Sequence, residues 1–160
     1  YKDLLYIREG AIDEALKLLK KGVTIYTDTK MALSGINKKA LEKLNCKVIS
    51  YVSEEEVAKI AKEREITRSM AAVEKAVEDG TQFFVFGNAP TAVFKLKELV
   101  EEGKANPKFI IACPVGFVGA AECKVEIEKL NIPMITVRGR KGGSGIAACI
   151  VNALMYMLAR

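Results

Sequence analysis

Apolar residues along this 160-residue chain follow two different patterns. Where they recur every three or four positions they predict amphipathic helices, and short continuous apolar runs predict strands that are buried on both faces. Helices are expected at 10–21, 37–44, 54–63, 67–78, 90–102, 121–130 and 146–158, and strands at 23–26, 46–52, 82–86, 108–112 and 132–137. This alternation predicts an α/β fold, a three-layer doubly wound sandwich with a mainly parallel sheet of about five strands.

Local signals mark the ends of several helices. Asn37 is expected to cap one helix, Pro90 to open another, and Ser53 with Glu56 to form a capping box. No linker, repeat or low-complexity segment interrupts the pattern, so residues 1–160 are expected to form a single domain.

Composition removes several classes of function. The net charge is +5, but cations and acids are interspersed, so nucleic-acid binding is not supported. We expect no signal peptide, and the most apolar segment, 146–158, is too short to span a bilayer, so we expect no membrane partner. The four cysteines have no C-x-x-C spacing and histidine is absent, which predicts a cytoplasmic protein without a metal site or a cofactor.

Polar or glycine-rich corners follow four of the expected strands. Ligands of open α/β sheets bind beyond the carboxyl ends of the strands, where such corners meet. Arginine early in a helix, as at Arg68, opposes the helix dipole and also suggests a ligand. The residues expected to bind a ligand are Thr27, Asp28, Thr29, Arg68, Ser69, Asn88, Thr91, Gly116, Phe117, Val118, Arg138, Arg140, Gly142, Gly143 and Ser144.

The last of these corners, 138–145, combines cations with glycines between a strand and a helix. Glycine lets backbone N–H groups approach a ligand, and a helix N-terminus adds partial positive charge. Arg138, Arg140 and Lys141 add full charges, so the corner is expected to bind an anion. The alternative is a glycine-rich turn with solvated cations.

Each of the other corners also has a structural alternative. Asp28 could act as a base, orient a donor, or form a local turn. Asn88 could contact a ligand or take part in helix capping. Phe117 and Val118 could meet a flat apolar ligand or a subunit, or could plug the core. The apolar final helix could lie in the core or at a dimer contact.

Several common motifs are absent from the sequence. K-G-G-S-G lacks the spacing of a Walker loop, and neither G-x-G-x-x-G after the first strand nor G-x-S-x-G occurs. Without histidine no Ser-His-Asp triad can form. These absences remove the usual nucleotide-binding and hydrolase assignments for this fold class.

Five motifs of this chain resemble, in the same order, successive motifs of the precorrin-8X methylmutase family. They are T-D-T-K-M-A-L-S-G-I, T-R-S-M-A-A, F-G-N-A-P-T-A-V-F, P-V-G-F-V-G-A-A-E and V-R-G-R-K-G-G-S-G-I-A. The resemblance covers the chain from about residue 11 onward. It implies an isomerase of cobalamin biosynthesis that moves a methyl group from C11 to C12 of precorrin-8X or its cobalt form. It also implies a homodimer with the tetrapyrrole held near the subunit interface.

The chain departs from the family pattern at the proton donor. The resemblance implies a catalytic histidine in an N-terminal segment, and no histidine occurs here. We therefore expect either a chain that lacks this segment or a relative without the donor, in which case Asp28 and Tyr1 are the groups to test. Cys123 stands where the family usually has serine. Two other functions remain open: a non-catalytic tetrapyrrole carrier, and an unrelated α/β enzyme that binds a phosphorylated metabolite at 142–145.

Overall fold

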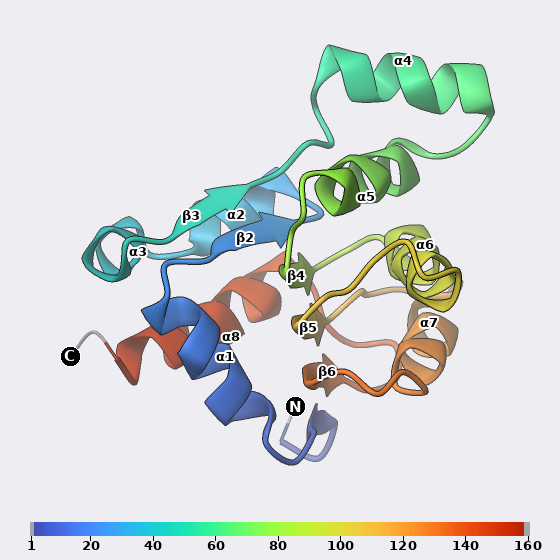
Figure 1. Cartoon of the computed structure of the whole chain (residues 1–160). Coiled ribbons are helices and arrows are strands. Elements are labelled where there is room, and N and C mark those ends of the chain that lie inside the picture. The colour runs from blue at the N-terminus through green and yellow to red at the C-terminus, as the bar shows by residue number, and fades with distance from the viewer. Residues whose placement is uncertain (1, 159–160) are drawn as a thin grey trace.

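The computed structural model describes residues 2–158, which form one six-stranded sheet between two layers of helices (Figure 1). The strands are β1 (Leu5–Ile7), β2 (Thr24–Thr27), β3 (Lys47–Ile49), β4 (Phe83–Phe86), β5 (Phe109–Ala112) and β6 (Met134–Val137). The helices are α1 (Ala11–Lys20), α2 (Lys30–Gly35), α3 (Lys38–Leu44), α4 (Glu55–Arg64), α5 (Arg68–Glu78), α6 (Pro90–Glu101), α7 (Ala120–Ile127) and α8 (Ser144–Tyr156).

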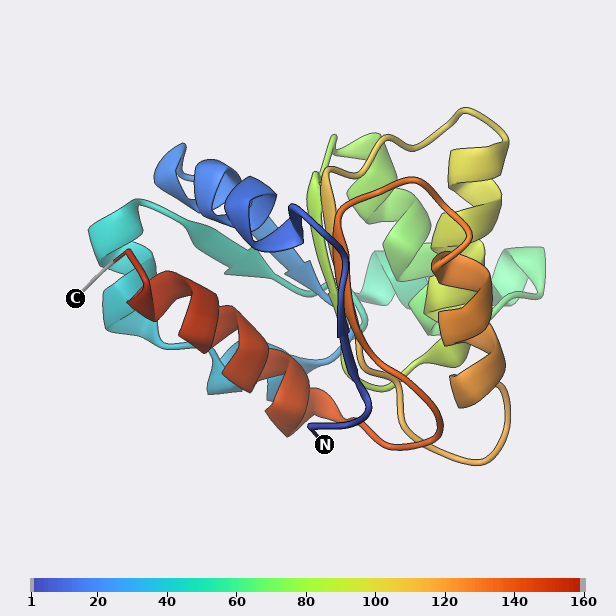
Figure 2. The ribbon, with the colours of Figure 1, turned by 90° about the horizontal axis from the view of Figure 1, so that it is seen from below.

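The sheet has the order β1-β6-β5-β4-β2-β3, and every pair except β1–β6 is parallel. Helices α1, α2, α3 and α8 cover one face, and α5, α6 and α7 cover the other (Figure 2), with α4 packed against α5. The expected doubly wound α/β sandwich with a mainly parallel sheet is confirmed.

Continuous apolar runs form the central strands because both faces of the sheet are covered. Successive side chains of a strand point to opposite faces. Phe83 and Val85 of β4 therefore join the core beneath α1 and α8, whereas Phe84 and Phe86 join the core beneath α5 and α6. All four are 0 % exposed.

Four local expectations need correction. β1 and α2 were not expected, and the helix start at Ser53 is wrong. The N-cap of α4 is Glu54, and no side chain caps it, because the chain is still in a turn at Ser53. β3 covers only Lys47–Ile49 rather than all of 46–52, since it pairs with β2 alone at the edge of the sheet.

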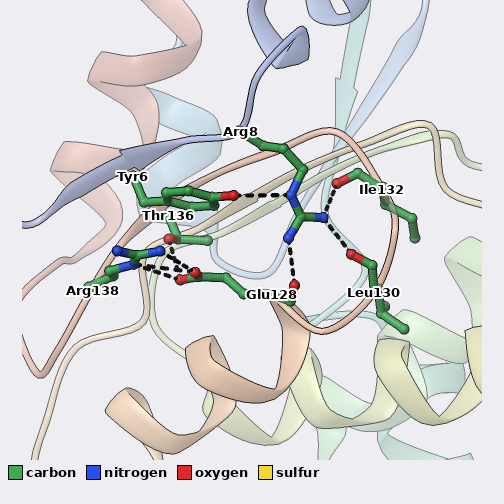
Figure 3. A network of polar contacts seen from close by, with 7 residues as sticks. All are labelled: Tyr6, Arg8, Glu128, Leu130, Ile132, Thr136 and Arg138. Atoms are coloured by element: carbon green, nitrogen blue, oxygen red, sulfur yellow. Dashed lines mark hydrogen bonds and ion pairs between the residues drawn. The ribbon is translucent and has the colours of Figure 1, made fainter.

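Arg8, which directly follows the antiparallel strand β1, connects this strand to the end of α7 through hydrogen bonds (Figure 3). Its guanidinium donates to the carbonyl oxygens of Glu128 at 2.5 Å, Ile132 at 2.8 Å and Leu130. These carbonyls lie at and just beyond the C-terminus of α7, where backbone acceptors lack helical partners. A single side chain thus satisfies three acceptors and fixes the chain that leads into β6.

Among residues 2–158, no helix has the length and apolar character needed to cross a membrane.

Candidate functional site

The carboxyl ends of β2, β4, β5 and β6 bring the four expected corners into contact. Thr29 Oγ1 lies 2.8 Å from Ser144 Oγ, which joins the corner after β2 to the start of α8. A Cβ placed on Gly87 would lie 2.7 Å from Ser144 Cα, so the corner after β4 packs directly on the same helix. Gly116 N donates to Arg140 O at 3.0 Å and joins the remaining two corners.

Asp28 holds the loop after β4 in place. Its carboxylate accepts hydrogen bonds from the backbone N–H groups of Gly87 at 2.7 Å, Asn88 at 3.0 Å and Ala89 at 2.8 Å. The side chain is 1 % exposed. Burial raises the pKa of this carboxyl, and the three amide donors oppose the rise. This burial and these bonds favour the structural alternative over the role of a base, and they make Asp28 the group that positions the loop carrying Asn88.

The two threonines beside Asp28 also have protein partners. Thr27 is buried, and its hydroxyl donates to Thr29 O at 2.9 Å, so the expected ligand contact of Thr27 is not supported. Thr29 caps α2 by accepting from Ala32 N at 3.0 Å, and it is partly exposed. Of this pair, Thr29 alone can reach a ligand without rearrangement.

Polar groups around the N-termini of α5 and α6 lie together at another part of the carboxyl edge of the sheet. Thr67, the N-cap of α5, lies 3.3 Å from the hydroxyl of Thr91 in the first turn of α6. Arg68 is exposed beside Thr67, and Ser69 follows half-buried. Asn88 is exposed, and Asp28 accepts from its backbone N–H rather than from its side chain. The structure therefore brings Arg68, Thr91 and Asn88 to the same edge of the sheet.

Gly142 and Gly143, which precede α8, allow this segment to pack closely against the backbone of Cys113 at the end of β5. Gly143 N donates to Cys113 O at 2.8 Å. A Cβ on Gly142, whose φ is +159°, would lie 2.2 Å from Cys113 O, so no larger residue fits there. No side chain caps the start of α8. Its first N–H groups and its partial positive charge thus remain directed toward the edge.

The loop between β5 and α7 places its apolar side chains in solvent. Phe117 is 83 % exposed and Val118 is 90 % exposed, so the expectation that they could plug the core is wrong. The Arg140 guanidinium carbon lies 5.5 Å from the centre of the Phe117 ring. An aromatic face and a cation are therefore presented together beside the glycine corner.

Arg138 has a different partner from the expected ligand (Figure 3). Its Nη2 donates to Glu128 Oε1 at 2.7 Å, and its guanidinium carbon lies 4.1 Å from the centre of the Tyr6 ring. Glu128 also accepts from the Thr136 hydroxyl at 2.9 Å. Glu128 thus occupies the Nε and Nη2 donors of a guanidinium whose side chain is 56% exposed, and the expected contact of Arg138 with a ligand stays a prediction.

Lys124 was not expected from the sequence, because a charged residue in a helix is usually solvated. Its side chain is 1 % exposed, and its Nζ donates to Gly139 O and to Lys141 O, both at 2.8 Å. The nearby thiols of Cys113 and Cys123 have pKa values of about 12 because both are buried. Neither thiol is a practical base at neutral pH. Tyr1, the other candidate proton donor, lies outside the described residues.

Comparison with known proteins assigns this arrangement to a family. The profile of precorrin-8X methylmutase matches residues 1–157. The cobalt-precorrin-8 methylmutase of Salmonella typhimurium is 44% identical over 158 residues, which are 98% of this chain and 73% of that protein. The precorrin-8X methylmutase of Pseudomonas aeruginosa is 40% identical over 156 residues, which are 95% of this chain and 74% of that protein.

Solved structures agree with the sequence comparison. The crystal structure of a precorrin-8x methyl mutase from Thermus thermophilus superposes with a TM-score of 0.91 at 33% identity, covering 99% of this chain and 77% of that one. A structure described as a precorrin-8X methylmutase related protein gives a TM-score of 0.89 at 33% identity, covering 98% and 82%.

Proposed function

Because the chain belongs to the precorrin-8X methylmutase family, we propose that the carboxyl edge of its sheet holds a tetrapyrrole during an intramolecular methyl shift. The protein is a methylmutase, an isomerase of cobalamin biosynthesis. We assign the binding of its substrate to the carboxyl edge of the sheet. The observation that carries it is the convergence of Thr29, Asn88, Arg140 and the start of α8 at one edge.

The charges at this edge suit a macrocycle bordered by carboxylates. Arg68, Arg140 and Lys141 are exposed, and none forms an ion pair with another residue in the described part of the chain. Guanidinium groups bind carboxylates in a bidentate fashion, and the N-terminus of α8 adds backbone donors. We assign carboxylate binding to these groups, with Asn88, Thr91, Ser69 and Ser144 as neutral partners.

The exposed loop after β5 suits the flat apolar part of the same molecule. Phe117 and Val118 lie between Gly116 and Gly119, both of which have positive φ. Burying the Phe117 side chain against a macrocycle would remove apolar surface from water and contribute roughly 1.5–3 kcal/mol to binding. Because the Arg140 guanidinium lies beside the Phe117 ring, it would then be close to a carboxylate at the border of the bound macrocycle.

In the mechanism, these residues bind and orient the substrate. A methyl shift between neighbouring ring carbons needs a fixed geometry and a proton donor, and positioning alone can lower the barrier substantially. Asp28 contributes by fixing the loop of Asn88. The resemblance assigns the donor to a histidine, and the 160 residues contain none.

We propose that a second copy of the chain packs on the outer face of α8. This face borders a cavity of about 390 Å³ with a mainly apolar lining, formed by Gly35, Gly145, Ala148, Cys149, Asn152, Ala153 and Tyr156. Small side chains let a second helix approach closely. Gly145 belongs both to this face and to the first turn of α8, so a partner here would border the substrate edge.

Ala153→Arg tests this dimer because it places a charge on the proposed contact. Sedimentation should give twice the mass of one chain for the wild type and the mass of one chain for the variant. Cys149 is exposed in the single chain, so its alkylation should be slow in the wild type and fast in Ala153→Arg. A monomeric wild type at micromolar concentration would contradict the proposal.

The substrate edge is tested by conversion of precorrin-8X and of cobalt-precorrin-8, since relatives of both names occur at similar identity. An isomerisation changes the visible spectrum and leaves the mass unchanged. Phe117→Ala should raise the Kd for either tetrapyrrole about 10-fold or more, whereas Val125→Ala, which truncates another exposed apolar side chain, should leave the Kd unchanged. Equal effects of the two variants would place substrate elsewhere.

Neither of the other functions considered is favoured. Close relatives over nearly the full chain carry methylmutase names, which argues against both a non-catalytic carrier and an unrelated metabolite-binding enzyme.

A further inference from the structure

Lys124 is a buried ammonium group without a carboxylate partner in the described part of the chain. It lies in α7 and is 1 % exposed. Its two acceptors are the carbonyl oxygens of Gly139 and Lys141, both at 2.8 Å. Burying a cation is costly unless it is paired, and two carbonyl dipoles compensate only part of that cost. The ammonium group of Lys124 lies directly behind the turn 139–141, which carries the cations of Arg140 and Lys141 at the substrate edge.

The carbonyls of this turn are all bound to α7 or to the loop before it. Lys124 holds Gly139 O and Lys141 O, and Gly116 N donates to Arg140 O at 3.0 Å. In a trans peptide the carbonyl of one residue and the N–H of the next point in opposite directions. The N–H groups of Arg140, Lys141 and Gly142 therefore point away from these partners.

These three N–H groups are free of protein acceptors throughout residues 2–158. Consecutive free N–H groups attract anions. The side chains of Arg140 and Lys141 are exposed beside them. Main-chain donors and cationic side chains thus share one turn, and the orientation of that turn depends on Lys124.

We propose that Lys124 is a positioning residue for substrate binding, which holds the turn 139–141 so that its amides and cations face a substrate carboxylate. This inference rests on the proposed function, because it concerns the same edge. Lys124 does not touch the substrate in this account; it acts through the Gly139 and Lys141 carbonyls. A purely structural lysine would affect stability without affecting affinity selectively.

The experiment measures binding of cobyrinic acid, a corrin with several carboxylates, by visible absorbance. Lys124→Met removes the ammonium while keeping the length of the side chain, and Lys124→Arg keeps a charged donor. Lys129→Met is the control, since Lys129 is 61% exposed and pairs with Glu126. We expect Lys124→Met to raise the Kd about 10- to 100-fold, Lys124→Arg to restore part of the affinity, and Lys129→Met to match the wild type.

Amide NMR of the wild type provides a test that does not depend on any variant folding. Adding cobyrinic acid should shift the N–H signals of residues 140–142 strongly. If the wild type binds cobyrinic acid but these signals do not move, or if folded Lys124→Met binds as tightly as the wild type, the role of Lys124 is wrong and the proposed function stands. If the wild type fails to bind, the proposed function is wrong and the inference falls with it.

Discussion

Replacing Asp28 by asparagine removes the charge at the centre of the β4–α6 loop and keeps the size of the side chain. In the wild type, Oδ1 accepts from Gly87 N, and Oδ2 accepts from Asn88 N and Ala89 N. An amide group has one oxygen and one NH₂, so at least one of these buried N–H groups must face another donor.

The expected cost follows from this count of bonds. A hydrogen bond to a charged group contributes about 1.5–3 kcal/mol, and an unsatisfied buried donor costs about 1–3 kcal/mol. The asparagine regains part of this because a neutral group is cheaper to bury than a carboxylate. We expect a net loss of about 2–4 kcal/mol in the free energy of unfolding.

Urea unfolding followed by circular dichroism measures this loss. Asp79→Asn is the control, because Asp79 is exposed and its Oδ2 accepts a hydrogen bond from the Tyr51 hydroxyl that an amide oxygen can still accept. It should change the stability by less than about 1 kcal/mol. A loss below that level for Asp28→Asn would refute the account of Asp28 as the group that holds the loop.

Three further predictions concern packing and protonation. Gly142→Ala should lower the free energy of unfolding by about 2–4 kcal/mol, since the added Cβ would lie 2.2 Å from Cys113 O. Gly143→Ala is the control and should lower it less, because a Cβ there meets no atom within 4 Å. Equal losses of the two variants in urea unfolding would contradict the close approach. Cys113 and Cys123 should resist iodoacetamide in the native protein at about pH 8, because only the thiolate reacts and burial raises both pKa values to about 12; rapid native labelling seen by mass spectrometry would show that the thiols are accessible. Asn152→Ala should cost about 1–3 kcal/mol by removing its bonds to Asn37 N and Gly35 O, and an unchanged midpoint in urea would show that these bonds contribute little.

The layers of the fold could be predicted because the central strands are continuous apolar runs and the helices are amphipathic. β1 could not, because it has only three residues at a sheet edge, and Leu5 and Ile7 remain 43% and 41% exposed. Its place depends on Arg8 bonding to carbonyls at least 120 residues away, which no local pattern reveals.

The candidate site could be predicted in outline because parallel strands end at one edge. Partners that depend on tertiary contacts could not. The partner of Arg138 is Glu128, ten residues earlier at the end of α7, and the sequence offers many other carboxylates. Asp28 binds amides about 60 residues away, and Lys124 is buried within a helix that also carries exposed charges.

The most direct test of the central claim compares cations at opposite edges of the sheet. Arg140 lies at the carboxyl edge, and Lys47 is an exposed cation at the start of β3 on the other edge. Titration with cobyrinic acid should show Arg140→Ala binding more weakly by about 1.5–3 kcal/mol, while Lys47→Ala retains the affinity of the wild type. Unchanged affinity in Arg140→Ala, or an equal loss in Lys47→Ala, would contradict binding of the tetrapyrrole at the carboxyl edge.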